Sequence, residues 1–372
     1  MIAWRESRER ILGMVRKEFR QVFRDPRMLR VIFLAPIIQL IVFGYAVSTD
    51  VRRTATFVVD HDRTRASREL VDALTASGYF RVTGRSERPA DLVRALDHGD
   101  AILGVEIPRG FATALGDGAA EVQLLLDGTN SNTATVARGY AERIVLAHGF
   151  RHLGAAAPEP AVDLRDRAWY NPDLASRNYN VPGVVGALVL LVTQLLTALA
   201  VVREREIGTL EQLLVSPLRP GEMIAGKAIP FALIGLADLT AVTGIALLWF
   251  DVPFRGHFVV LLGASVLFVL SGLGAGLLIS TISATQQEAF LASFLVFMPV
   301  LLLSGFLFPV SSMPEVFQWL TLANPLRHYV EVVRAVFLKG AGLHLWPQLL
   351  ALALLGVMLL GSAARRFGRA EG

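Results

Sequence analysis

Six stretches of the chain are almost entirely apolar, and each is about twenty residues long, the length that an α-helix needs to cross the hydrocarbon core of a bilayer. Only 18% of the residues are charged, whereas a soluble protein carries about 25%. The chain is therefore expected to be a polytopic α-helical membrane protein with six transmembrane helices. In an alternative interpretation of the first span, Ala46-Val47-Ser48 is the processing site of a cleaved signal peptide. The expected spans are residues 28–48, 179–202, 224–250, 258–282, 288–308 and 345–364.

Residues 49–178 have the composition of a soluble domain, in which short β-type runs alternate with helical runs. This alternation is typical of an α/β domain, here of about 100 residues, inserted between the first and second spans. A linker rich in Gly, Ala and Pro, residues 154–160, leads back toward the membrane. The expected strands are 56–60, 80–83, 101–107 and 121–126, and the expected helices are 64–77, 89–97, a short one from Pro108, and 130–152.

The first 27 residues read as an amphipathic helix that lies at the membrane interface. Arginines and a lysine fill the face opposite its apolar line. The alternative is an ordinary surface helix of a soluble domain. The apolar line, which recurs every four residues, consists of Ile11, Val15, Phe19 and Phe23.

A second amphipathic segment, 203–216, joins the expected second and third spans. It combines several charges with an apolar face that includes Ile207 and Leu210. Ser216-Pro217 is expected to end it, because the residue before proline avoids the helical region. Such a helix can pass motion between the membrane and a soluble partner. The alternative is a helix on the membrane surface, stabilised by its own Glu–Arg pairs.

Basic residues near the ends of the spans set the expected orientation. They are concentrated in residues 1–30, 203–227 and the tail 365–372, which all fall on one side if there are six spans. That side is expected to be the cytoplasm of a bacterial cell, with the chain in the inner membrane and the α/β domain outside. Residues 309–342 are interrupted by prolines and are expected to enter the membrane partway and return.

Three polar side chains fall inside expected spans, namely Gln39, Gln194 and Asp238. A carboxylate at the centre of a span costs about 2.5–3.5 kcal/mol unless it faces protein or water. Asp238 is therefore a candidate for the lining of a translocation path or for a dimer contact. A hydrogen bond between helices is the alternative. Gly272 and Gly276 have the spacing that permits close helix contact.

Catalytic chemistry is poorly supported. The chain has no cysteine, which excludes disulfides and thiolate metal sites. The segment 221–228 approaches a phosphate-binding loop, but Ala228 stands where the loop needs a hydroxyl. His148 and His152 lack a third metal ligand nearby. No catalytic residue, metal or bound cofactor is expected, and nucleic acid is not an expected partner.

Several motifs together resemble the ABC-2 type permeases, particularly those of drug and multidrug exporters. They are Asn178-Tyr-Asn-Val-Pro-Gly183, Glu204 to Leu214, Ser304-Gly-Phe-Leu-Phe-Pro309, Met313-Pro314, and Asn324-Pro-Leu-Arg327 through Lys339-Gly340. The resemblance covers essentially the whole chain. It implies that the chain binds no cofactor itself and works with a separate ATPase that carries ATP and magnesium. It also implies a second permease copy or paralogue and leaves open a periplasmic adaptor.

The resemblance further implies roles for individual segments. Residues 203–216 would be the coupling helix that docks on the ATPase, and 309–342 would form the outer gate. An ion-coupled secondary transporter and a membrane sensor with an outer ligand-binding domain are the alternatives. The expected coupling residues are Glu204, Arg205, Glu206, Ile207, Gly208, Thr209, Leu210, Glu211, Leu213 and Leu214. The expected path or gate residues are Gln39, Gln194, Asp238, Gly305, Phe306, Pro309, Asn324 and Pro325.

Overall fold

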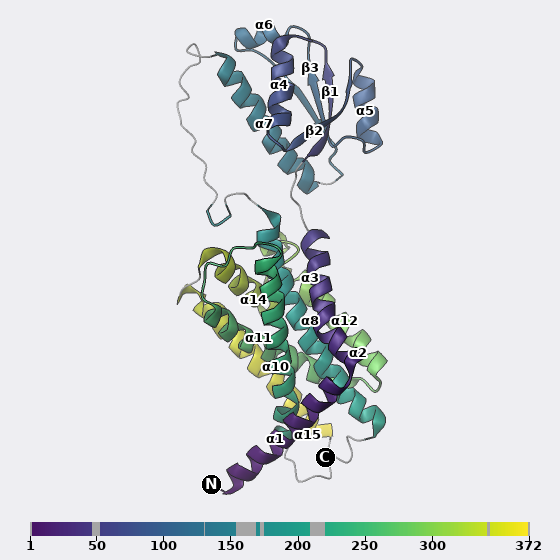
Figure 1. Ribbon diagram of the computed structural model, residues 1–372, viewed down its shortest axis with the longest axis vertical. Coiled ribbons are helices and arrows are strands. Elements are labelled where there is room, and N and C mark those ends of the chain that lie inside the picture. Colours follow the sequence, from purple (N-terminus) through teal and green to yellow (C-terminus); the bar gives the residue numbers. More distant parts are fainter. Residues whose placement is uncertain are drawn as a thin grey trace. The chain divides into compact units, whose positions relative to one another are not determined.

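The computed structural model describes residues 2–46, 53–129, 131–153, 169–171, 175–208, 220–340 and 343–370. The chain forms two compact units (Figure 1). The helical unit comprises Met1–Ser48 and Ala168–Gly372, and the α/β unit comprises Thr49–Arg167.

Long apolar helices build the helical unit and confirm a polytopic membrane protein. Among the described helices, four are long and apolar enough to cross a membrane, and they are α8 (Ser176–Ile207), α10 (Pro220–Leu248), α11 (Phe258–Ile282) and α15 (Trp346–Ala370). Two shorter apolar helices, Ile32–Ala46 and Gln286–Leu302, occupy the expected first and fifth spans. In the region of the expected first span, α2 (Pro26–Leu29) is followed by a π-helical turn η1 (Arg30–Leu34) and by α3 (Ala35–Ala46), and the expected fifth span is α12 (Gln286–Leu302).

Two glycines allow α8 and α11 to approach closely. A Cβ atom built on Gly272 would lie 2.4 Å from the hydroxyl oxygen of Thr193, and one built on Gly276 would lie 2.4 Å from the carbonyl oxygen of Gln194. No side chain larger than hydrogen fits at that separation without movement of the helices. The close contact expected from the glycine spacing is therefore confirmed.

Short helices broken by prolines connect α12 to α15. Pro309 and Pro314 immediately precede the first two of them, and Pro325 is the first residue of α14, where its missing N–H costs nothing. The expected interruptions are thus present, while entry into a membrane stays a prediction. The elements are η3 (Val310–Ser312), α13 (Glu315–Leu320), η4 (Thr321–Ala323), α14 (Pro325–Arg334), η5 (Ala335–Lys339) and η6 (Leu343–Leu345).

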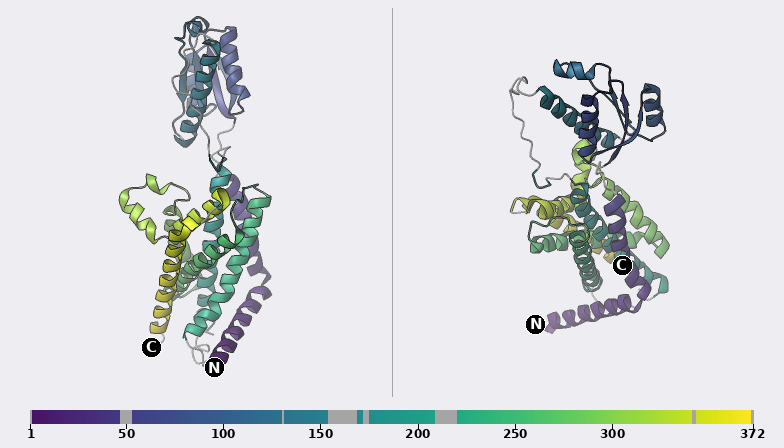
Figure 2. Two further views of the ribbon diagram at one scale, coloured as in Figure 1. Left: turned by 90° about the vertical axis from the view of Figure 1, so that its left-hand side faces the viewer. Right: turned by 45° about the horizontal axis from the view of Figure 1, so that its top comes forward.

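The N-terminal helix α1 (Ile2–Arg24) packs against α10, and Figure 2 shows the two helices side by side. Gly226 of α10 makes the approach possible, because a Cβ atom there would lie 2.6 Å from Cγ of Met14. The buried side chains of α1 form a line next to the expected one. Met14, Glu18 and Val22 are at most 5% exposed, whereas Phe23 is 56% exposed. The other residues of the expected line, Ile11, Val15 and Phe19, are half-buried.

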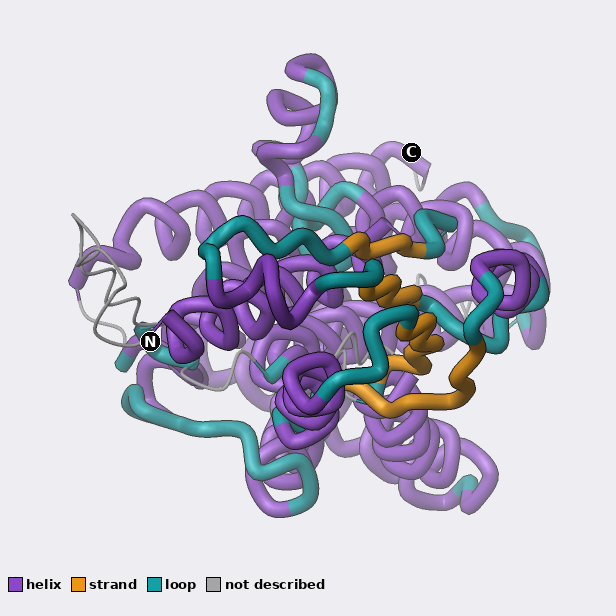
Figure 3. The backbone as a smooth tube through the Cα atoms, turned by 90° about the horizontal axis from the view of Figure 1, so that it is seen from above, coloured by secondary structure: helices purple, strands orange, loops and turns teal. Residues whose placement is uncertain are grey.

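The α/β unit contains one four-stranded sheet in the order β2-β1-β3-β4. Its strands are the orange segments of Figure 3. β1 is parallel to both of its neighbours, and β4 is antiparallel to β3. Helix α5 lies on one face, and α4, α6 and α7 pack together on the other (Figure 1). The strands are β1 (Thr54–Asp60), β2 (Phe80–Ser86), β3 (Leu103–Ile107) and β4 (Gln123–Leu126). The helices are α4 (Arg65–Ala76), α5 (Pro89–Asp97), α6 (Phe111–Gly116) and α7 (Ser131–Leu153).

Candidate coupling site and membrane path

Four charged side chains from three helices meet inside the helical unit. Lys17 and Glu18 belong to α1, Glu204 lies near the end of α8, and Lys227 lies in α10. Glu18, Glu204 and Lys227 are 2%, 4% and 1% exposed. The ammonium group of Lys227 donates to Glu204 and lies 3.5 Å from Oε1 of Glu18, and Lys17 bridges the same two carboxylates. We call these four residues the charge cluster.

The charge cluster is electrically balanced, with two cations and two anions. Balance matters because an unpaired buried charge is expensive, and removing one partner of a buried pair costs about 3–5 kcal/mol. Desolvation opposes the charged form of Lys17, but its hydrogen bond and attraction to Glu204 prevail and raise the pKa of Lys17. The cluster therefore ties α1 to the ends of α8 and α10.

A second ion pair strengthens the link between α1 and α10. Nε and Nη2 of Arg10 donate to the two carboxylate oxygens of Glu222 at 3.0 and 2.9 Å. This parallel arrangement matches the planar guanidinium to the planar carboxylate and is stronger than a single hydrogen bond. Glu222 is in the first turn of α10, where a negative charge also complements the helix dipole.

The last turn of α8 contacts the C-terminal end of α11 and the start of α12. Nη1 of Arg205 donates to the carbonyl oxygens of Ser280 and Ser283 at 3.0 and 2.8 Å. Glu206 accepts hydrogen bonds from the backbone N–H, at 2.7 Å, and from the side-chain amide of Gln286. The charges at the end of α8 therefore act within the chain, and the carboxylate of Glu204 does not face outward.

The expected continuous helix over 203–216 is wrong at Gly208. Residues 203–207 continue α8, and Gly208 follows in the left-handed conformation, with φ of 78°, which ends the helix. Ile207 is 64% exposed, so it is the described coupling residue that presents an apolar surface. The expected coupling residues Thr209, Leu210, Glu211, Leu213 and Leu214 lie outside the described residues.

The polar residues of the expected spans have different surroundings. Gln39 is half-buried. Gln194 is buried, and its amide donates to the carbonyl oxygen of Ser293 in α12 at 3.1 Å, so it links two helices. Asp238 is 0% exposed, and neither carboxylate oxygen has a hydrogen-bond partner among the described residues. In this conformation, Asp238 therefore faces neither an open path nor a surface for a second copy.

The expected gate residues have different contacts, and Phe306 is the one that packs against the start of α8. Phe306 is buried beside Gly183, where a Cβ atom would lie 2.2 Å from its ring. Gly305 has φ of 76°, a conformation that favours glycine. Asn324 caps α14 through Leu326 N–H at 2.9 Å, and its amide also donates to the carbonyl oxygen of Val300 in α12 at 2.7 Å.

Arg334 of α14 is a connection that sequence reasoning missed. Its guanidinium donates to the carbonyl oxygens of Tyr179, Gly305 and Phe306 at 3.2, 3.1 and 3.3 Å, and it lies 3.5 Å from the centroid of the Tyr179 ring. One side chain thus joins the gate segment to the start of α8. The signal in the sequence was an arginine within an amphipathic helix, which by itself does not identify its partners.

A cavity of about 260 Å³ lies beside the charge cluster, between α1, α8, α10 and α12. Its walls are mostly apolar, and its charged lining residues are Glu18, Asp25 and Arg203. An apolar wall with a few charges is suited to an amphiphilic molecule. The apolar lining residues include Val22, Leu195, Leu196, Leu199, Ala200 and Phe231.

Comparison with known proteins identifies the family. The model of the ABC-2 family transporter protein matches residues 26–365. The probable multidrug ABC transporter permease YbhR of Escherichia coli K12 is 34% identical over 354 residues, which cover 93% of this chain and 96% of the relative. The corresponding permease YbhS of the same organism is 32% identical over 91% of this chain and 90% of its own length.

A third relative, the inner membrane transport permease YhhJ of Escherichia coli K12, is 28% identical, and 96% of each chain is covered. Three findings point to a membrane permease. The chain has helices able to span a membrane, the family model matches most of it, and these relatives are themselves named as permeases. The chain belongs to the ABC-2 transporter family and is the membrane-spanning permease subunit of an ATP-binding-cassette exporter.

Proposed function

We propose that the chain pairs with a second permease and docks on a separate ATP-binding-cassette ATPase through a surface built from α1 and the end of α8. The segment 209–219 that follows α8 would complete this surface. The observation that carries the proposal is the charge cluster, in which Lys17, Glu18, Glu204 and Lys227 link α1 to α8 and α10. ATP and magnesium would be held by the ATPase, and this chain would form no bond with them.

The charge cluster supplies a route for force. The ion pairs and the buried packing of α1 join three helices at one end of the unit. A displacement applied just after Gly208 would therefore move α1 and α10 together with α8. Breaking a buried pair costs several kcal/mol, so the three helices would move as one body rather than separate.

The proposed arrangement in the membrane has six spans. The two shorter apolar helices would be the first and fifth spans, and tilt or local thinning of the bilayer accommodates short spans. Basic residues in 1–30, 203–227 and 365–372 favour a cytoplasmic position for both termini in a bacterial inner membrane. The α/β unit would then be extracytoplasmic, where an adaptor protein could reach it.

The proposed substrate is an amphiphilic or drug-like compound taken from the cytoplasm or the inner leaflet. Two relatives are named as probable multidrug permeases. The apolar cavity beside the charge cluster supports this class, because its walls would accept an apolar body and its charges a polar group. Gln39, Asp238 and the gate residues are the proposed lining of the path in other conformations of the transport cycle.

Co-purification of the permease with its ATPase tests the docking surface. The chain with Leu210→Asp and Leu214→Asp is expected to lose capture of the ATPase, because charges replace the apolar contact. A control with Val93→Asp and Leu146→Asp adds the same charges at exposed positions of the α/β unit and is expected to retain capture. Equal recovery of the ATPase by both variants would contradict the proposal and favour a membrane-surface role for the segment.

A further inference from the structure

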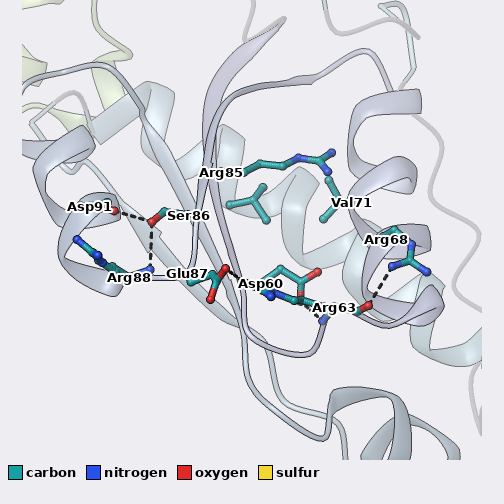
Figure 4. A pocket seen from close by; sticks show the side chains of 10 residues that line it. Asp60, Arg63, Arg68, Val71, Arg85, Ser86, Glu87, Arg88 and Asp91 are labelled. Carbon is teal, nitrogen blue, oxygen red and sulfur yellow. Dashed lines mark hydrogen bonds and ion pairs between the residues drawn. The ribbon is translucent and has the colours of Figure 1, made fainter.

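A cavity of about 750 Å³ opens in the α/β unit at the carboxyl ends of two neighbouring parallel strands. Asp60 is the last residue of β1 and Ser86 the last of β2. Helix α4 lines one side and the first turn of α5 another, as Figure 4 shows. In open α/β sheets, ligands bind outside the carboxyl ends of the strands. The cavity therefore lies where this architecture places its binding sites.

The carboxylates that line the cavity are already engaged within the unit. Asp60 accepts a hydrogen bond from the hydroxyl of Ser67 at 2.7 Å and two more from backbone amides. Glu87 is ion-paired with Arg63. Asp91 accepts from a serine hydroxyl at 2.5 Å and from a guanidinium one helical turn later at 2.8 Å. Two of the three carboxylates are thus paired with arginines, whereas the donors to Asp60 are neutral, so Asp60 keeps its charge and offsets one of the remaining cations.

Three arginines of the cavity have no carboxylate partner. Within the part of the chain that the structure describes, the guanidinium groups of Arg85 and Arg88 have no ion pair or hydrogen bond. Arg68 donates only to the carbonyl oxygen of Arg63, at 2.9 Å, so its charge is not balanced. Figure 4 shows Arg85 extending from β2 toward Val71 of α4. The cations come from β2, α4 and the residue before α5, and all three line the cavity.

We propose that this cavity binds a small anion with phosphate or carboxylate groups, held by Arg68, Arg85 and Arg88. The planar guanidinium presents a fork of N–H donors that matches both kinds of group. The volume falls in the range of small-molecule sites, about 300–1,000 Å³, and is larger than a single phosphate requires. The ligand is therefore a phosphate ester or a polycarboxylate, either free in solution or as the headgroup of an anionic lipid. The site does not depend on how the ATPase docks.

Hydrogen–deuterium exchange of the full-length permease tests the site. In one arm, the protein in uncharged detergent is titrated with glycerol 3-phosphate and with citrate. In the other arm, it is embedded in nanodiscs of phosphatidylglycerol or of zwitterionic phosphatidylcholine. The expected result is slower exchange in residues 60–68 and 84–91 in at least one arm. Protection by the soluble anions identifies a free ligand, and protection by phosphatidylglycerol alone identifies a lipid headgroup.

Two pairs of variants distinguish binding in the cavity from a nonspecific effect of positive charge on the unit. Arg85→Ala with Arg88→Ala is expected to weaken binding of the protecting anion at least about tenfold, because two charge-assisted contacts are lost. Arg81→Ala with Arg109→Ala removes the same charge from the same unit outside the cavity and should leave binding within about twofold. All four side chains are exposed, so folding should not change. No protection by any probe, or equal weakening by the two pairs, would overturn the proposal.

Discussion

Lys227 of α10 donates to the carboxylate of Glu204 at the end of α8, and both side chains are buried inside the helical unit. Lys227 is in the first half of an apolar helix, and Glu204 is near the end of a helix that contains one of the most apolar stretches of the chain. Neither charge would be stable there alone. Their pairing with Lys17 and Glu18 makes the contact between α1, α8 and α10 specific rather than merely apolar.

Removal of Lys227 is therefore expected to be costly. Lys227→Met leaves two buried glutamates with one lysine, and the expected loss of stability is about 3–5 kcal/mol. The double variant Lys227→Met and Glu204→Gln is expected to lose less, because the orphaned charge is removed as well. Thermal unfolding, followed by fluorescence-detected size-exclusion chromatography, ranks the stabilities of the wild type, the single variant and the double variant. Arg366→Met, at an exposed position, is the control, and a double variant no more stable than the single would contradict this interpretation.

Gly276 is expected to tolerate no side chain. Gly276→Ala would push a methyl group against the backbone of α8, so the transition temperature should fall. Gly263→Ala in the same helix meets no atom within 4 Å and should be neutral or slightly stabilising, because alanine favours helix more than glycine by about 1 kcal/mol. The comparison of the two transition temperatures measures the effect. Equal temperatures would show that α8 and α11 do not pack as described.

Arg334 is expected to hold the gate segment against α8. Arg334→Ala removes the hydrogen bonds to three carbonyl oxygens, so these acceptors lose the donor that joins the gate segment to α8. Amide exchange in residues 305–312 should become at least about tenfold faster. Lys339→Ala, which removes an exposed cation from the same region, should leave exchange unchanged. Similar exchange in both variants would mean that Arg334 does not restrain the segment.

Acid is expected to weaken the α/β unit through His148. Burial lowers the pKa of His148, and the nearby His152 and Arg151 lower it further. The unfolded chain then binds a proton before the folded one, so stability is lost as the pH falls from about 6.5 through the lowered native pKa. Thermal unfolding at pH 7.5 and 5.5 should show a smaller acid effect for His148→Asn than for wild type. His98→Asn, at an exposed position, should behave as wild type, and equal acid effects in all three proteins would contradict the prediction.

Local patterns in the sequence were sufficient for most of the helices and strands. The helices 89–97 and 258–282 have the expected bounds, because one begins with proline and the other is a long apolar run. The break at Gly208 was missed, although glycine is a common end signal, since the apolar spacing continues past it. The amphipathic pattern and the glycine gave conflicting local evidence, and the glycine prevailed.

The charge cluster could not be found from local patterns. Lys17 and Glu204 are 187 positions apart, and no spacing rule pairs residues at that separation. Glu18 lies between two buried apolar positions of α1, Met14 and Val22, which is a signal that a buried acid needs a partner. Which lysine pairs with Glu18 depends on how the helices pack. Sequence reasoning placed Glu204 at the coupling site but not its contacts inside the chain.

In the proposed orientation, α1 and the end of α8, with the segment after Gly208, face an ATPase in the cytoplasm. The chain has no cysteine, so single cysteines report position without background. In intact cells, Gln212→Cys should resist a membrane-impermeant maleimide and react only after permeabilisation, whereas His98→Cys in the α/β unit should react at once. Ready labelling of position 212 in intact cells would contradict both the orientation and the coupling mechanism.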